Sequence, residues 1–348
     1  MEKTGSVAVV RPALGFPVKK NYAKARSTQV QKVIVSTIAG DGTAGFLDGP
    51  ALDAKFKSPL DIAVLPGGII YVADAFNSCI RKIHNGMVTT FAGNGNANIT
   101  NGNGRDARFK IPSRLTLDAR GNLYTLDAAD PRIRKIDPAA DVYTYAGTNI
   151  FGFKDGKAAF AQFGQSFGIV GDRLGNIYIA DTQNDSIRKI SYTGEVNTIA
   201  GIQENGDPNR KIVQFNFVTG IAIDKHDNLF VSDITKIHKI TPAGIISTFA
   251  GSNLKGFVDG RRDIARFSQM EDIILDDRGN IYVSDGNRIR KITLDGEVST
   301  VAGSSSGYQD GDGISAKFNG PQGLAIDANE NIYVADFNNK SIRKISFA

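Results

Sequence analysis

A short apolar segment that ends in aspartate recurs six times along the chain. It reads I-Y-V-A-D at residues 70–74, and its five later copies end at Asp127, Asp181, Asp233, Asp285 and Asp336. Successive copies are 51 to 54 residues apart. A fixed period of this size is typical of solenoids and propellers, whose units stack around a shared core. The repeat therefore predicts one repeat domain within the 348 residues, where length alone would suggest two or three.

Within each repeat, four short apolar segments alternate with turns. In the first copy they cover residues 62–65, 69–74, 79–84 and 88–93, separated by P-G-G and N-G turns. Such spacing is typical of hairpins, so each unit is predicted to be a four-stranded antiparallel sheet. Segments such as I-Y-V-A are apolar on both faces, as expected for sheets packed between two neighbours. Six sheets of this kind predict an all-β fold, a six-bladed β-propeller.

The two ends of the chain complement one another. The sixth copy stops after its R-K-I segment at residues 343–345 and lacks a last strand. Residues 33–40 read V-I-V-S-T-I-A-G and match that missing strand, so the N-terminal strand is predicted to complete the last blade and remove an open edge. Residues 1–29 match no repeat; we expect an N-terminal segment or linker there, or the remnant of a preceding domain, with the propeller at 30–348.

The basic charge is concentrated at the N-terminus. The chain carries a net charge of +5, but residues 1–32 hold seven Lys and Arg against one acidic residue, and the remainder holds 34 basic and 35 acidic residues. A neutral propeller gives little support to nucleic-acid binding, which needs clustered cations. No apolar run is long enough for a membrane helix. The single cysteine, Cys79, excludes an internal disulfide, and we expect it to be buried.

The repeat resembles a known family. The segment at 323–345, G-L-A-I-D-x-x-x-N-I-Y-V-A-D-x-x-N-x-x-I-R-K-I, is similar to the NHL repeat, and the six copies extend the resemblance over about nine-tenths of the chain. The loop at 39–56, A-G-x-G-x-x-G-x-x-D-G-x-x-x-x-A-x-F, resembles the longer-loop NHL units of bacterial surface and secreted proteins, often preceded by an immunoglobulin-like IPT/TIG domain. The resemblance implies a bacterial protein outside the cytoplasm or on the cell surface. It leaves function open, because such propellers include RNA- and protein-binding modules, lactonases and lyases.

Residues found in every copy are expected to build the fold. The strand-end aspartates are followed by Arg, or by His238 in the fourth copy, and we expect each to bind loop amides or that neighbour. An Asp-Gly step, replaced by Asn101 in the second copy, lies eight residues before a phenylalanine that occurs in all six. Turn formation explains it better than calcium binding, because the full calcium-loop pattern is missing.

Positions at which the copies differ are better candidates for a site. Five residues after the repeated phenylalanine, three copies have glycine, whereas the others have Asp61, Arg114 and Asp272. The position before it includes Phe167, Glu271 and Gln322. Both positions open the first strand of a blade, which lines the central channel of a propeller. We therefore expect these six side chains to surround one mouth of the channel, where closed barrels bind ligands.

These patterns predict a non-catalytic, monomeric module that binds a protein or carbohydrate through Asp61, Arg114, Phe167, Glu271, Asp272 and Gln322. We expect no catalytic residue, no cofactor and no nucleic-acid partner, and leave open a divalent ion such as calcium in the channel. The alternative is a metal-assisted hydrolase or lyase that uses Asp61, Glu271 and Asp272. A simpler interpretation also remains, in which Asp61 pairs with Arg114 and Glu271 faces water.

Overall fold

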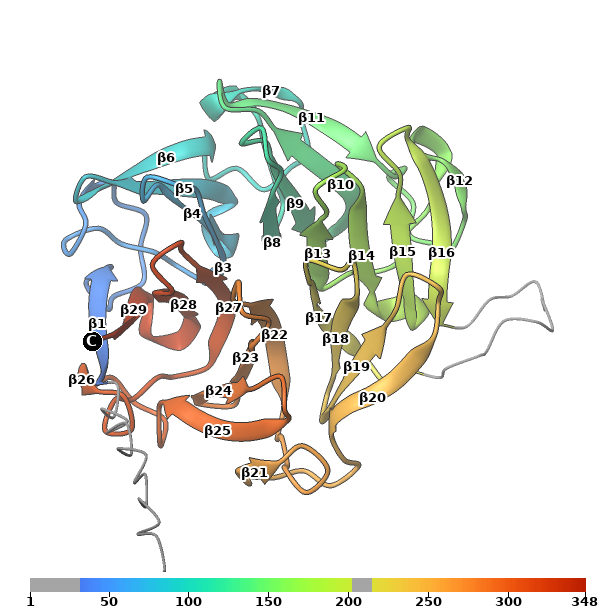
Figure 1. Cartoon of the computed structure of the whole chain (residues 1–348). Helices are drawn as coiled ribbons and strands as arrows, with labels where there is room; N and C mark the ends of the chain where they lie inside the picture. Colours follow the sequence, from blue (N-terminus) through green and yellow to red (C-terminus); the bar gives the residue numbers. More distant parts are fainter. Residues whose placement is uncertain (1–31, 202–214) are drawn as a thin grey trace, which may run out of the picture. The chain divides into compact units, whose positions relative to one another are not determined.

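Six antiparallel sheets surround a central channel and confirm the all-β six-bladed β-propeller (Figure 1). The computed structural model describes residues 32–201 and 215–348. The expectations for residues 1–29 and for the Asp-Gly step of the fourth repeat fall outside these residues. We number the blades 1 to 6 by their repeat. No helix in the described part of the chain is long and apolar enough to cross a membrane.

Each blade contains four strands that run in order from the channel to the rim. Their bounds are, in blade 1, β3 (Pro59–Val64), β4 (Ile70–Asp74), β5 (Cys79–His84) and β6 (Met87–Gly93); in blade 2, β8 (Pro112–Leu117), β9 (Leu123–Asp127), β10 (Asp130–Ile136) and β11 (Asp141–Ala146); in blade 3, β13 (Gly168–Gly171), β14 (Ile177–Asp181), β15 (Ser186–Ile190) and β16 (Glu195–Gly201); in blade 4, β17 (Val218–Ile223), β18 (Leu229–Asp233), β19 (Lys236–Ile240) and β20 (Ile246–Gly251); in blade 5, β22 (Met270–Leu275), β23 (Ile281–Asp285), β24 (Arg288–Ile292) and β25 (Glu297–Ala302); and in blade 6, β27 (Pro321–Ile326), β28 (Ile332–Asp336), β29 (Ser341–Phe347) and β1 (Val33–Ala39).

A fifth, two-residue strand covers the outer edge of five blades, which the four-strand prediction did not include. These strands come from the Asp-Gly loops and from Asn101-Gly102, and are β2 (Gly49–Pro50), β7 (Gly102–Asn103), β12 (Gly156–Lys157), β21 (Gly260–Arg261) and β26 (Gly311–Asp312). Each pairs with the outermost strand of its blade, where it satisfies backbone groups that would otherwise face water. Within the described residues, the sheet of blade 4 has four strands.

The N-terminal strand closes the ring as predicted. β1 pairs antiparallel with β29, from Val33 opposite Phe347 to Ala39 opposite Ile342. In Figure 1 the blue β1 lies beside the red strands of blade 6. The backbone groups of Lys32 and Ala348 also exchange two hydrogen bonds at 2.8 Å, so the two ends of the propeller are joined directly.

Apolar side chains fill the spaces between neighbouring blades. The repeated phenylalanine is 0 to 2% exposed in all six blades, and every residue of the I-Y-V-A-D strand and its counterparts is buried. Cys79 is buried as expected. Five 3-10 helices lie in the described loops: η1 (Ala75–Asn77), η2 (Gly104–Asp106), η3 (Ala158–Phe160), η4 (Thr182–Asn184) and η5 (Phe337–Asn339).

The strand-end aspartates have the structural role that their uniformity predicts. In blade 1, Asp74 accepts hydrogen bonds from the backbone N–H groups of Lys57 and Ser58 and forms a fully buried ion pair with Arg81 at 3.0 Å. The same Arg81 binds the Asp-Gly residue Asp48 at 2.6 Å. Blades 3 and 6 repeat this Asp–Arg–Asp bridge, and blade 5 repeats it with a shorter loop. The carboxylates are therefore part of the fold.

Two blades depart from this bridge. In blade 2, Arg134 is bonded to Asn101 and to two backbone carbonyls, and no contact with Asp127 below 4 Å occurs. Of the two expected partners, Asp127 therefore binds the loop amides, those of Lys110, Ile111 and Ala129, and forms no ion pair with Arg134. In blade 4, His238 Nε2 lies 3.2 Å from Asp233.

Candidate functional site at the central channel

The innermost strands bulge where the variable residues occur. The register between the first two strands shifts between Pro59 and Asp61 in blade 1, and between Pro112 and Arg114 in blade 2. Blades 4, 5 and 6 shift at the corresponding positions. A β-bulge bends its strand and redirects the side chains beside it. The bulges therefore turn these residues toward the channel, as the position of the sequence differences predicts.

Asp61 joins blade 1 to blade 2. Its Oδ1 accepts the N–H of Ile62 at 2.8 Å, and its Oδ2 accepts the N–H of Leu115 in the next blade at 2.6 Å. The side chain is 4% exposed. Asp61 therefore connects the innermost strands of blades 1 and 2. Both of its carboxylate oxygens accept backbone N–H groups, and the structure shows no ion pair within 4 Å between Asp61 and Arg114.

Asp272 makes the same connection between blades 5 and 6. Its Oδ2 accepts the N–H of Leu324 at 2.8 Å, and its own N–H donates to Ser284 Oγ at 3.1 Å. A glycine precedes each aspartate around the ring. An added Cβ at Gly323 would lie 2.6 Å from the Asp61 Cα, and one at Gly220 would lie 2.9 Å from the Asp272 Cα. Each aspartate thus follows a glycine because the two innermost strands approach too closely there for a second side chain.

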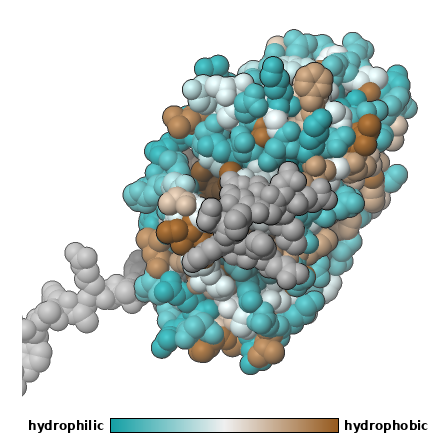
Figure 2. Space-filling model, turned by 90° about the vertical axis from the view of Figure 1, so that its right-hand side faces the viewer, coloured by the Kyte–Doolittle hydropathy of each residue, from teal (hydrophilic) through white to brown (hydrophobic). Residues whose placement is uncertain are grey.

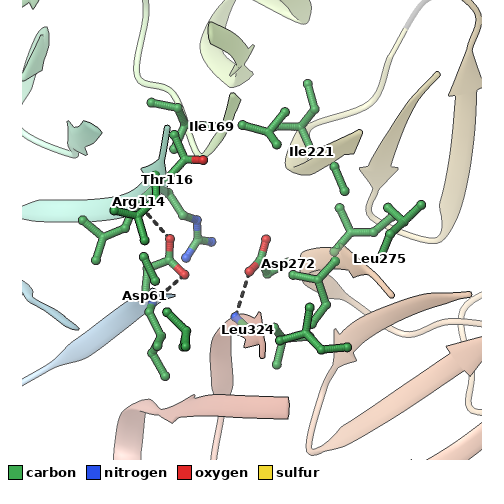
Figure 3. A pocket seen from close by; sticks show the side chains of 18 of the residues that line it. Asp61, Arg114, Thr116, Ile169, Ile221, Asp272, Leu275 and Leu324 are labelled. Carbon is green, nitrogen blue, oxygen red and sulfur yellow. Dashed lines mark hydrogen bonds between the residues drawn. The ribbon is translucent and has the colours of Figure 1, made fainter. Parts of the chain in front are cut away.

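Arg114 crosses the channel between the two carboxylates (Figure 3). Its Nε donates to the Phe167 carbonyl in blade 3 at 2.8 Å, and its two terminal nitrogens donate to the Leu60 carbonyl in blade 1 at 3.4 Å and the Glu271 carbonyl in blade 5 at 3.2 Å. One guanidinium therefore connects four blades, counting its own. At 5% exposed, it forms the floor of the mouth above and the roof of the channel below.

The channel beneath Arg114 encloses a cavity of about 260 Å³. Asp61, Arg114 and Asp272 line its upper end, and the rest of its wall is mainly aliphatic, including Val64, Leu117, Ile223, Leu275 and Ile326. The predicted six residues therefore divide into two groups. Three line the cavity, whereas Phe167, Glu271 and Gln322 do not. Phe167 and Glu271 lie next to the guanidinium, which donates to their backbone carbonyls.

Burial raises the pKa of all three acidic groups near the channel. For Asp61 the cause is burial first and then the charge of Asp272, and Arg114 and the two bonded N–H groups oppose the rise. Burial likewise raises the pKa of Asp272 and of Glu271, against the lowering effect of Arg114 in each case. Glu271 is half-buried and accepts a hydrogen bond from Gln269 Nε2 at 2.6 Å in an exposed position.

The channel gives the metal-assisted alternative little support. A divalent ion needs several oxygen or nitrogen ligands that converge, and both oxygens of Asp61 are already occupied. In residues 32–201 and 215–348, no three His, Cys, Asp or Glu side chains are placed to hold a metal.

Sequence reasoning missed two features of the mouth. Serine replaces the alanine of I-Y-V-A-D in blades 4 and 5, and Ser284 Oγ donates to the Gln322 carbonyl at 2.7 Å. The other is Phe217, whose ring lies 6.2 Å from that of Phe167 and is 50% exposed. The serine change was visible as a sequence difference. Phe217 could not be singled out from the sequence, because it lies two residues after the repeated Phe215 at a position where the six blades share no consensus residue.

Comparison with known proteins identifies the repeat and the fold. The family model described as "NHL repeat" matches residues 56–83 and 318–345. Mouse teneurin-3 is 27% identical over 371 residues, covering 91% of this chain but 13% of teneurin-3. A protein of unknown function from Bacteroides thetaiotaomicron superimposes with a TM-score of 0.71 at 23% identity, covering 91% of this chain and 76% of that one. An auxiliary nutrient binding protein from the same species gives 0.69 at 18% identity, covering 91% and 77%. The chain is thus a six-bladed β-propeller, similar in fold to these proteins of Bacteroides and in sequence to part of the teneurins, with a match to the NHL repeat in two of its six repeats.

Proposed function

We propose that this propeller is a non-catalytic binding module that recognises a carbohydrate at the channel mouth. The observation that carries the proposal is that two aromatic rings and a hydrogen-bonded amide–carboxylate pair flank the guanidinium of Arg114. Phe167 and Phe217 lie in blades 3 and 4, and Gln269 and Glu271 lie in blade 5. Aromatic rings bind the apolar face of a sugar, while amides and carboxylates bind its hydroxyl groups.

The floor favours a ligand that rests on the mouth and does not enter the channel. Arg114 is bonded to the carbonyls of both Phe167 and Glu271, so the aromatic and the acidic sides of the mouth are separated by little more than one guanidinium. A sugar ring is wide enough to contact both sides. Gln322 lies next along the ring, since its carbonyl accepts the Ser284 hydroxyl.

Backbone strain at Phe217 supports the same location. Phe217 has φ of 73°, in the left-handed region that bulky residues seldom adopt. Such a conformation costs about 1–3 kcal/mol and is concentrated at binding and catalytic sites. The likeness to an auxiliary nutrient binding protein is compatible with this function, and a protein surface is the other ligand that the sequence suggests.

A glycan array of neutral oligosaccharides, followed by calorimetry of each hit, tests the proposal. We expect Phe217→Ala and Glu271→Gln to weaken binding at least tenfold, because each removes one side of the mouth. Phe160→Ala is the matched control, since this phenylalanine is 65% exposed on the η3 loop, away from the mouth. Binding of no neutral glycan, or equal losses in the control, would overturn the proposal, as would a Phe217-dependent protein ligand in the absence of any glycan.

A further inference from the structure

A second cavity lies on the opposite face of the propeller, between blades 2 and 3. Its volume is about 320 Å³, larger than that of the channel cavity. It is lined by the turn after β8, by β9 to β11, and by the turns after β13 and β15. The mouth lies where β8 begins, near Pro112, whereas this cavity lies where β8 ends, near Asp118. We call it the tyrosine groove, for Tyr124, Tyr145 and Tyr192 in its wall.

Tyr124 is the tyrosine of the repeated I-Y-V-A-D strand, whereas the other two tyrosines of the groove occur in one blade each. Tyr145 replaces an apolar residue that is Ile199 in blade 3, and Tyr192 replaces the residue that is Pro242 in blade 4. Tyr124 and Tyr145 pack edge to face, with ring centroids 4.9 Å apart. The backbone N–H of Tyr192 donates to Asn176 Oδ1 at 3.0 Å, which fixes the turn, and the Tyr192 side chain is 71% exposed. The groove therefore presents aromatic surface on two sides.

The acidic side chains of the groove are already fully bonded. Asp118 accepts the N–H groups of Arg120 and Asn122, the Asn122 side-chain amide and the Tyr124 hydroxyl. Asp172 accepts the corresponding four donors in blade 3. Neither carboxylate has an acceptor position left for a ligand, although both keep their negative charge because all the donors are neutral.

Two cations of the groove remain available. Within the described residues, the guanidinium of Arg120 and the ammonium of Lys135 have no hydrogen-bond or ion-pair partner, and Lys135 Nζ lies 5.4 Å from the Tyr124 ring centroid. Arg173 is not counted with them, because it donates to the Lys225 carbonyl at 2.8 Å in blade 4. With three basic and two acidic side chains, the groove has a net charge of +1. Its free donors are those of Arg120 and Lys135, which favours an anionic group between them.

The next groove around the ring offers an internal comparison. The cavity between blades 3 and 4 has the same scaffold, with Lys189 over Tyr178 at 5.4 Å and a volume of about 220 Å³. There, however, Leu174 stands in place of Arg120, Ile199 in place of Tyr145 and Pro242 in place of Tyr192. The rim of the molecule around these blades is mainly hydrophilic, with apolar residues in small separate groups (Figure 2). The tyrosine groove therefore differs from its neighbour in both charge and aromatic content.

We propose that the tyrosine groove is a second binding site, specific for an acidic saccharide. A sugar ring rests against Tyr145 and Tyr192, and its carboxylate or sulfate lies between Arg120 and Lys135. The open groove, with Tyr192 and Leu174 both largely exposed, suits one unit of a longer chain. The site is independent of the channel mouth, from which it is separated by the length of the innermost strands.

Titration with trigalacturonic acid, followed by tyrosine fluorescence, tests this site. The chain has ten tyrosines and no tryptophan, so the signal reports the tyrosines directly. We expect saturable binding that weakens with added salt, because exposed charges are screened, and no binding of the neutral maltotriose. Arg120→Leu and Tyr145→Ile copy residues that the neighbouring groove already accommodates, so both variants should fold with unchanged thermal unfolding. Each should weaken binding at least tenfold.

Phe217→Ala, at the mouth, is the matched control and should bind trigalacturonic acid as the native protein does. Three results would overturn the proposal: no saturable binding of the acidic trisaccharide, undiminished binding by both groove variants, or loss of binding in Phe217→Ala. The last would place an acidic sugar at the channel mouth instead.

Discussion

The guanidinium of Arg114 donates to the backbone carbonyl of Glu271 on the far side of the channel, 157 residues later in the chain, at 3.2 Å. It also reaches carbonyls in blades 1 and 3. The planar fork of arginine can serve several acceptors at fixed angles, whereas the single ammonium of lysine cannot. One side chain thus fixes the distance between opposite blades and sets the depth of the mouth.

Arg114→Lys is therefore expected to lower the free energy of unfolding by about 2 kcal/mol or more, since hydrogen bonds from a charged donor contribute roughly 1.5–3 kcal/mol each. Urea denaturation measures the loss. Arg278→Lys is the control, because Arg278 is an exposed partner of Glu330 and surface pairs contribute about 0–1 kcal/mol. A loss in Arg114→Lys no larger than that of the control would contradict the bridging role.

The pH dependence of stability should reveal the half-buried Asp272. Its folded-state pKa is raised, mainly by burial. The folded protein therefore holds a proton that the unfolded chain has released, so the contribution of Asp272 to stability falls as the pH rises from its ordinary value of about 4 through the raised pKa. Asp272→Asn should remove this dependence.

Native and Asp272→Asn proteins are compared by urea denaturation at successive pH values from 4 to 8. The difference between them should change across the lower part of this range, by at most about 1.4 kcal/mol per pH unit, and in the direction that favours the variant at higher pH. Asn retains an oxygen for the Leu324 N–H. A difference that does not vary with pH would show that Asp272 titrates normally.

The sequence predicted the positions of the site residues better than their contacts. The repeat placed Asp61, Arg114 and Asp272 on innermost strands, and all three line the channel. Periodicity locates a Cα atom in a blade, but it does not say how far a long side chain reaches. Arg114 thus binds backbone carbonyls in other blades and not Asp61, with which the simpler interpretation paired it. The carboxylate of Asp61 already accepts the N–H groups of Ile62 and Leu115.

Phe217 at the mouth was harder to predict, because its side-chain direction depends on an unusual backbone conformation. Phe217 adopts a left-handed conformation without the glycine or asparagine that normally signals one. The two-residue outer strands were missed similarly, because Gly-containing pairs such as Gly49–Pro50 are read as turns. Both features depend on tertiary contacts that a single repeat does not contain.

Removal of the closing strand should destabilise the whole ring. Deletion of residues 1–40 removes β1, which pairs with β29 over its length and carries the edge strand β26. We expect a large fall in the thermal unfolding temperature, because the deletion exposes the edge of blade 6 and opens part of its apolar contact with blade 5. Deletion of residues 1–31 is the control that isolates the strand. Equal unfolding temperatures for the two truncated proteins would refute the closure.

Asn101→Asp should stabilise blade 2 by restoring the bridge found in its neighbours. Arg134 is fully buried, its Nε has no partner in the described part of the chain, and burial lowers its pKa to about 10. In blade 1 the equivalent Asp48 binds both Arg81 and Thr90.

A carboxylate at 101 would supply Arg134 with a counterion and could accept from Thr144, the residue paired with Arg134 on β11. We expect a gain of about 1 kcal/mol in the free energy of unfolding, the usual size of one added hydrogen bond. The reverse change in blade 1, Asp48→Asn, should cost at least as much, because it weakens an existing ion pair. Chemical denaturation of both variants measures the effects, and a destabilised Asn101→Asp protein would mean that blade 2 cannot adopt the bridge of the others.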